Sequence, residues 1–178
     1  MGEDPLFNLF DTYFCGRPCA QTWADLWLWE RLLNRDSYKG IIEIGTWQGG
    51  FSTYLSLQTT IRGMDFITFD SIVPDLPPAE FRRCDVFIEH AYVEAVIESY
   101  SPVVLFCDGG NKPREAKMFA PFLGPEDLLV VHDWGTEFLE TDIPDCVEPY
   151  MLEVTESLPS MSRLFKKKGG ADATEVPG

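Results

Sequence analysis

Short apolar segments with the character of strands alternate with helical segments along most of this chain, and this alternation constrains the fold more than any other feature. Segment 21–35 is amphipathic at helical spacing; the period then changes, and 40–45 (GIIEIG) is a short apolar run that ends in glycine, as a buried parallel strand does. Further strands are predicted at 65–70, 81–86, 103–108 and 127–133, and further helices at 50–57, 89–100, 114–123 and 145–157. Such alternation builds βαβ units, so the sequence predicts an α/β fold: a single doubly wound, mostly parallel sheet with helices on both faces.

The chain is expected to form one domain, because its 178 residues lie within the usual range of about 100–200 and no internal repeat is visible. We assign this domain to 1–168, of which 1–38 is a helical lead-in. The small and polar residues of 169–178 are expected to form a flexible tail.

The chain is strongly acidic, with a formal net charge of −15 and a pI near 4.4. Such a surface repels phosphate backbones and anionic lipids, so neither nucleic acid nor a membrane is an expected partner. No apolar run approaches the ~18–20 residues that span a bilayer, and the N-terminus is acidic where a signal peptide needs positive charge. We therefore expect a cytoplasmic protein, and we leave its oligomeric state open, a homodimer included.

Acidic residues or a glycine loop stand at the ends of the predicted strands. Ligands of doubly wound sheets bind outside the carboxyl ends of the strands, where packing does not require a carboxylate. The repetition of such residues along one edge of the sheet therefore predicts a ligand site. Its residues are Glu43 to Gly45, Asp70, Asp85, Asp108 and Asp133.

The loop after the first strand reads EIGTWQGG (43–50) and opens a helix. Glycines let a backbone turn tightly and approach a ligand, and the free N–H groups of the helix start face that ligand. The spacing is G-x-x-x-G-G, with Trp47 where a dinucleotide loop needs its middle glycine, which argues against NAD. A carboxylate in the position of Asp70 can accept hydrogen bonds from both hydroxyls of a ribose. The unit thus predicts a cofactor that carries adenosine but is not a dinucleotide.

At this point the sequence resembles a known family. The stretch IIEIGTWQGGFSTYLSL, followed by FITFD, resembles the opening motifs of class I S-adenosylmethionine-dependent methyltransferases. The later stretch LFCDGGNKPREAKMFAPFLGPEDLLVVHDWG is similar to the small-molecule O-methyltransferases of the cephalosporin hydroxylase and macrocin O-methyltransferase types, and TWADLWLWERLL looks like their lead-in helix. The resemblance covers roughly residues 20–136. It implies a Rossmann-like methyltransferase fold, S-adenosylmethionine as cofactor, and O-methylation of a small-molecule acceptor.

The resemblance also implies which residues hold the cofactor. The glycines of the first loop shape the floor under its methionine part, and the glutamate of that strand end places its amino group or nearby backbone. Asp70 holds the ribose, and Asp85, with Cys84 beside it, lies where the adenine amine is usually bound. The full implied set is Glu43, Gly45, Gly49, Gly50, Asp70, Asp85 and Asp108.

For catalysis, the candidates are Lys112, His132 and Asp133. The resemblance places Asp108 and Asp133 where related enzymes bind a divalent metal, and carboxylate oxygens suit Mg²⁺. Lys112 is a general base if it is desolvated, a solvated lysine at a helix start, or a replacement for the metal cation. His132 is either the imidazole that transfers a proton or a buried, hydrogen-bonded residue of its strand.

Two departures from the family pattern keep other functions open. The fourth-strand motif reads Asp-Gly-Gly-Asn-Lys (108–112) without the family's histidine, and only 161–168 offers a further strand where such domains usually end in two. Both favour an alternative, a catalytically degenerate protein that binds S-adenosylmethionine or a nucleotide. A nicotinamide-dependent oxidoreductase is the other alternative, against which Trp47 speaks.

Overall fold

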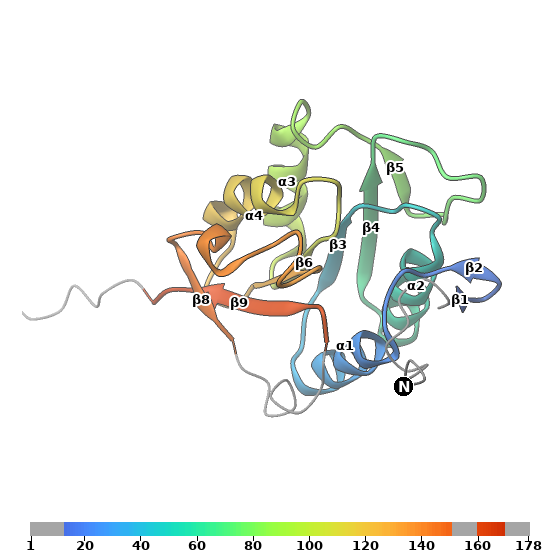
Figure 1. The fold of residues 1–178 in the computed structure, drawn as a ribbon, viewed down its shortest axis with the longest axis horizontal. Coiled ribbons are helices and arrows are strands. Elements are labelled where there is room, and N and C mark those ends of the chain that lie inside the picture. The colour runs from blue at the N-terminus through green and yellow to red at the C-terminus, as the bar shows by residue number, and fades with distance from the viewer. Residues whose placement is uncertain (1–12, 151–159, 170–178) are drawn as a thin grey trace, which may run out of the picture.

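The computed structural model describes residues 13–150 and 160–169, and a seven-stranded sheet runs through its centre (Figure 1). The strand order is β5-β4-β3-β6-β7-β9-β8. The strands β5, β4, β3, β6 and β7 are parallel, and β9 is antiparallel to both of its neighbours, β7 and β8. The strands are β3 (Gly40–Ile44), β4 (Asp65–Asp70), β5 (Phe81–Arg83), β6 (Val103–Cys107), β7 (Leu128–Val131), β8 (Val147–Pro149) and β9 (Arg163–Lys167).

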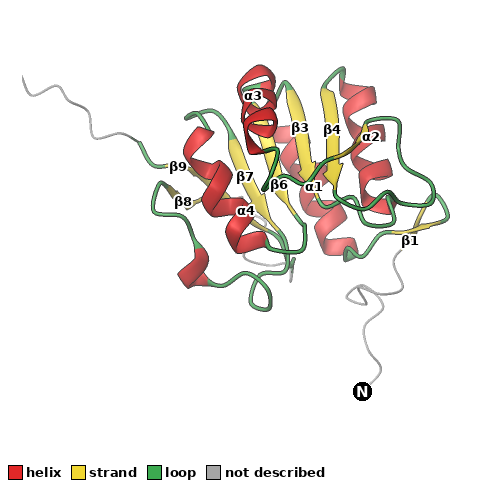
Figure 2. Ribbon diagram, turned by 90° about the horizontal axis from the view of Figure 1, so that it is seen from above, coloured by secondary structure: helices red, strands yellow, loops and turns green. Residues whose placement is uncertain are grey.

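Helices cover both faces of this sheet, with α1 and α2 behind it and α3 and α4 in front in Figure 2. The doubly wound, mostly parallel fold predicted from the sequence is therefore what the structure shows. The helices are α1 (Trp23–Arg35), α2 (Gly50–Arg62), α3 (His90–Tyr100) and α4 (Lys112–Phe119), with short 3-10 turns η2 (Ala120–Phe122) and η3 (Glu140–Asp142).

The two faces have separate apolar cores because successive strand side chains point to opposite sides. Ile41 of β3 and Phe106 of β6 pack with the helices of one face, in the cluster that contains Trp29 of α1. Their neighbours Ile42 and Leu105, which are paired in the sheet register, belong to the cluster of the other face. Burial on both faces explains why these strands read as continuous apolar runs.

Helix α1 begins with a capping box, in which Thr22 and Asp25 bond to each other's backbone N–H groups. Its Trp29 side chain is fully buried and meets Phe106 edge to face at a centroid distance of 5.1 Å, whereas Trp27 on the outer side is half exposed. The helix therefore covers the sheet, as the amphipathic pattern predicts.

The predicted helix 145–157 is wrong where the structure describes it. Residues 147–149 form β8, which pairs antiparallel with β9, and 151–157 lie outside the described residues. Pro149 would interrupt a helix but is tolerated in an edge strand. The sheet thus ends in two antiparallel strands, although the sequence offered only one in 161–168.

Several boundaries also differ from the predictions. The weak strand 81–86 shortens to 81–83, so Asp85 lies in the loop beyond it. Helix α2 continues five residues beyond the predicted end at 57 and stops at Gly63, whose left-handed backbone (φ 67°) terminates it. Helix α4 begins at Lys112 rather than at residue 114.

In the lead-in, the described residues contain a small hairpin of β1 (Tyr13–Phe14) and β2 (Arg17–Pro18) before α1, so this segment is not purely helical. Residues 1–12 and nearly all of the predicted tail, 170–178, lie outside the described residues. The helices of the described part are all too short or too polar to cross a bilayer.

Candidate functional site

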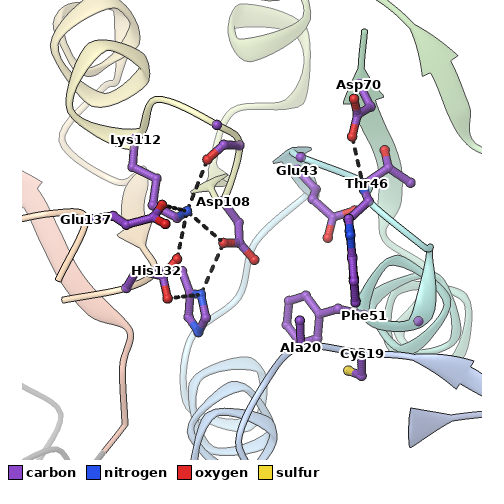
Figure 3. Close-up of a pocket in the computed structure, with 16 residues that line it drawn as sticks. Cys19, Ala20, Glu43, Thr46, Phe51, Asp70, Asp108, Lys112, His132 and Glu137 are labelled. Carbon is purple, nitrogen blue, oxygen red and sulfur yellow. Dashed lines mark hydrogen bonds and ion pairs between the residues drawn. The ribbon is translucent and has the colours of Figure 1, made fainter. Parts of the chain in front are cut away.

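A cavity of about 410 Å³ lies at the carboxyl ends of β3, β6 and β7 (Figure 3). β4 lies on one side of β3 in the sheet, and β6 lies on its other side, so the direction in which strands are added reverses after β4. The cavity therefore lies at the topological switch point, where doubly wound sheets bind ligands. The predicted site residues in its lining are Glu43, Gly45, Gly50, Asp70, Asp108, Lys112, His132 and Asp133.

A second cavity of about 220 Å³ adjoins the first. Both are lined by Asp70 and by Gly45, Gly109 and Gly110, so they form two parts of one depression along the strand ends. Asp85 lines the second part only, together with Cys84. Of the predicted cofactor residues, Gly49 lines neither cavity; a Cβ there would face Arg17 and the loop after β4 instead.

The glycine loop brings the backbones of two strand ends into contact. Gly45 has φ 102°, and a Cβ at this position would collide with the carbonyl group of Asp108. A Cβ on Gly50 would collide with the carbonyl of Pro18 in β2. Only glycine fits at both positions, because a Cβ would collide with a neighbouring backbone. At Gly45 the positive φ also favours glycine.

Three non-glycine residues in the cavity wall also adopt the left-handed region: Ala20 (φ 51°), Trp47 (φ 46°) and Asp133 (φ 58°). Each such residue costs on the order of 1–3 kcal/mol, and strained residues of this kind cluster at functional sites. The strain supports the assignment of this cavity as the functional site.

Glu43 lies at the floor of the cavity and is almost fully buried. Burial raises the pKa of its carboxyl group to about 8, although Ser52 donates a hydrogen bond to it. This shift favours the uncharged carboxylic acid at neutral pH, which can donate as well as accept a hydrogen bond.

The Asp70 carboxylate is held at the end of β4 by two backbone donors. The N–H of Trp47 donates to Oδ2 at 3.0 Å, and the N–H of Ile72 donates to Oδ1 at 2.9 Å. The carboxylate thus links the glycine loop to the loop after β4 and faces both parts of the depression. Each oxygen keeps a second lone pair for a ligand hydroxyl.

Lys112, the first residue of α4, is buried in the opposite wall with its side chain 5% exposed. Its Nζ lies 2.8 Å from Asp133 Oδ2, 2.8 Å from Glu137 Oε2, 3.6 Å from Asp108 Oδ1 and 3.1 Å from the Gly109 carbonyl (Figure 3). Burial opposes the charge, but these carboxylates outweigh it and raise the pKa of the ammonium. The alternative of a solvated lysine at a helix start is therefore wrong.

His132 is buried between three carboxylates. Its Nδ1 lies 3.1 Å from Asp108 Oδ1 and 3.3 Å from Asp133 Oδ1, and its Nε2 lies 3.9 Å from Asp25 Oδ2, too far for a hydrogen bond. Burial favours the neutral ring, but the charge of Asp108 and the neighbouring acids outweigh it and hold the His132 pKa well above its usual range. The pKa of Asp133 is shifted downward. Burial raises it, but His132 and Lys112 outweigh burial and hold the pKa of this carboxyl group well below its usual range.

The sequence analysis missed the contribution of the N-terminal segment. Gln21 donates from Nε2 to Asp108 Oδ2 at 2.8 Å, and Asp25 is fully buried and accepts hydrogen bonds from Ser160 and from the backbone N–H of Ser162. These contacts span the chain from α1 to the residues before β9. Asp25 occurs within an amphipathic helix pattern, and nothing local distinguishes it from a solvated acid.

No protein-family model matches this chain, and no curated protein matches its sequence significantly. Among solved structures, one described as "cmcI-N160 SAH" has a TM-score of 0.69 at 14% identity and covers 94% of this chain and 88% of that chain. Another, "CmcI-N160 apo-structure", has a TM-score of 0.55 at 16% identity, over 71% of this chain and 58% of that one. At these identities the likeness shows a shared fold, and it confirms the doubly wound, Rossmann-like architecture that the sequence predicts.

Proposed function

We propose that this protein is an S-adenosylmethionine-dependent methyltransferase that methylates an oxygen of a small-molecule acceptor. The observation that carries the proposal is the two-part depression at the switch point, both parts of which are lined by Gly45 of the glycine loop and by Asp70. The fold supports it, because the name of the first structural neighbour includes SAH, the abbreviation of S-adenosylhomocysteine.

In this proposal the cofactor spans both parts of the depression. Adenine occupies the second cavity near Asp85, and the ribose hydroxyls bind the Asp70 carboxylate. The methionine part lies over the loop of Gly45 and Gly50, near the protonated Glu43, in the first cavity. The methyl group then points toward the remaining space beside Asp108, where the acceptor would bind.

Methyl transfer asks the protein to align the acceptor oxygen with the S–CH₃ bond and to allow its proton to leave. The paired charges around Lys112 and His132 favour the protonated form of both at neutral pH, and Asp133 favours the ionised form. We therefore propose that these three residues orient groups in the site rather than remove the proton.

Lys112 and His132 are paired with carboxylates that favour their protonated forms, so neither is a ready proton acceptor. This pairing also favours a second candidate function. A protein that binds S-adenosylmethionine without turning it over needs a cofactor site but no proton acceptor. The two candidates share the same cofactor site and differ in the acceptor half.

The magnesium ion implied by the sequence resemblance is not part of the proposal. Asp108, His132 and Asp133 offer ligand atoms within 4.8 Å of one another, but the ammonium of Lys112 lies against both carboxylates. Because the ammonium of Lys112 already occupies the position between these carboxylates, the site does not fit a divalent cation as well. No step of the reaction is assigned to a metal ion.

The proposal is tested by thermal unfolding with added ligand. S-Adenosylhomocysteine should raise the melting temperature, since a ligand that binds only the native state stabilises it, and NAD should leave it unchanged. A rise with NAD alone would contradict the proposal and favour a nicotinamide-binding protein. Transfer of a labelled methyl group to a panel of small hydroxyl compounds then separates the enzyme from the binding protein.

A further inference from the structure

Four side chains in the cavity wall form a closed ring in which a basic group and an acidic group alternate. Lys112 Nζ contacts Asp108 and Asp133, and His132 Nδ1 contacts the same two carboxylates from the other side. We propose that Lys112 is the permanent cation of this site, in the place where a divalent metal would bridge the two carboxylates, and that the protein binds no divalent metal there. The inference deepens the proposed function, on which its catalytic meaning rests, but metal binding itself can be measured without turnover.

The position of the ammonium carries the inference. The Asp133 and Glu137 oxygens lie 2.8 Å from Nζ, the Gly109 carbonyl lies at 3.1 Å and Asp108 Oδ1 at 3.6 Å. These are four oxygens around one positive charge, and they come from two segments, the loop after β6 and the loop after β7. Carboxylate and carbonyl oxygens are also the ligands that Mg²⁺ prefers, so the lysine uses the donor set that the metal would need.

The fold holds the lysine in this position. Lys112 is the first residue of α4, Pro113 follows it in the first turn, and its side chain is 5% exposed. Asn111 is the N-cap residue of α4, and its side chain accepts a hydrogen bond from the Arg114 N–H. Its side chain is therefore used to start the helix that carries the lysine.

A divalent ion could enter only by displacing the ammonium. Two like charges a few ångströms apart repel each other strongly in a partly buried site, and moving Lys112 away would bury it without its partners or leave Glu137 unpaired. The lysine also acts through the carboxylates: by pairing with both, it fixes Asp108 and Asp133 at the cavity wall. Lys112 is thus a positioning residue.

The test measures Mn²⁺, an oxygen-binding stand-in for Mg²⁺, by electron paramagnetic resonance. Wild type should show no site with one Mn²⁺ per chain at millimolar metal. Lys112→Met removes the charge and keeps an unbranched side chain. It should bind one Mn²⁺ per chain, with an affinity at least about tenfold above the detection limit that wild type does not reach, because a like charge is lost from among the ligand oxygens. Lys117→Met is the matched control on the same helix, where the lysine is half exposed, and should behave as wild type.

Two results would overturn the inference. One is stoichiometric Mn²⁺ binding by wild type that Asp133→Asn abolishes; this arm decides the question even if Lys112→Met does not fold. The other is a folded Lys112→Met protein that binds Mn²⁺ no better than wild type, since the lysine is then not what excludes the metal. Stabilisation by S-adenosylhomocysteine, measured on the same proteins without metal, reports on the proposed function separately.

Discussion

Gln21 Nε2 lies 2.8 Å from Asp108 Oδ2, and this hydrogen bond connects the segment before α1 to the end of β6 across 87 residues of sequence. Asp108 accepts from Gln21 on one oxygen and contacts His132 and Lys112 with the other. The N-terminal segment is therefore part of the candidate site and not only a cover for the sheet.

Substitution of Gln21 should expose this role. Gln21→Met loses a hydrogen bond to a charged group, worth about 1.5–3 kcal/mol, but also removes the buried Oε1, which has no partner. Gln21→Glu keeps the shape and places a second carboxylate against Asp108, so it should destabilise more than Gln21→Met. Urea unfolding at pH 7 measures both; a Gln21→Glu protein as stable as wild type would contradict the assigned contact.

The glycine loop offers a matched pair of substitutions. Gly45 and Gly63 both have positive φ, but a Cβ at Gly45 meets the Asp108 backbone, whereas at Gly63 it meets open space. Gly63→Ala should cost about 1–2 kcal/mol for the left-handed backbone alone. Gly45→Ala should lower the free energy of unfolding clearly more than Gly63→Ala does, because the ends of β3 and β6 must move apart. It should also weaken the binding of S-adenosylhomocysteine. Equal losses of unfolding free energy would show that the close approach is absent.

Stability should fall with rising pH through the range in which Glu115 titrates. This carboxyl group is buried, and burial raises its pKa to about 7, although the N–H groups of Gly109 and Asn111 donate to it. Between the unfolded pKa near 4.5 and the folded pKa, the native state holds a proton that the unfolded chain has lost. The contribution of Glu115 to stability is therefore full below pH 4.5 and decreases up to about pH 7. The decrease is on the order of 3 kcal/mol at about 1.4 kcal/mol per pKa unit.

Glu115→Gln should make this part of the pH profile less steep, because the amide does not titrate; the slope from buried Glu43, whose pKa is raised to about 8, remains. Glu98→Gln, at an exposed position of α3, is the control and should keep the wild-type slope. Urea unfolding from pH 5 to pH 8 gives the comparison. Parallel profiles for all three proteins would place the titrating group elsewhere.

Much of the fold is predictable because its strands are buried on both faces. The apolar runs of β3, β6 and β7 are short, continuous and bounded by turn residues, so they are visible in the sequence. β8 was mistaken for a helix because three residues of an edge strand carry little local signal, and their conformation is set by pairing with β9. The length of α2 depended on Gly63, a stop signal that the prediction overlooked.

The site was predictable where a strand ends and obscure elsewhere. In a parallel sheet the carboxyl ends share one edge, so Asp70, Asp108 and Asp133 could be expected to meet. That Lys112 is buried could not be read from a helix-start position, because burial follows from the carboxylates that surround it in space. Gln21 and Glu137 reach the site from a lead-in segment and a loop, and only the folded chain brings them there.

The central claim, an adenosine-bearing cofactor held by Asp70, is tested most directly by calorimetric titration of S-adenosylhomocysteine into wild type, Asp70→Ala and Asp75→Ala. Asp75 is exposed in the loop after β4 and serves as the matched control. Wild type and Asp75→Ala should bind one ligand per chain with equal affinity. Asp70→Ala should bind about tenfold more weakly or worse, since charge-assisted hydrogen bonds to the ribose are worth about 1.5–3 kcal/mol. Equal affinity in all three folded proteins, or binding of NAD in place of S-adenosylhomocysteine, would contradict the account.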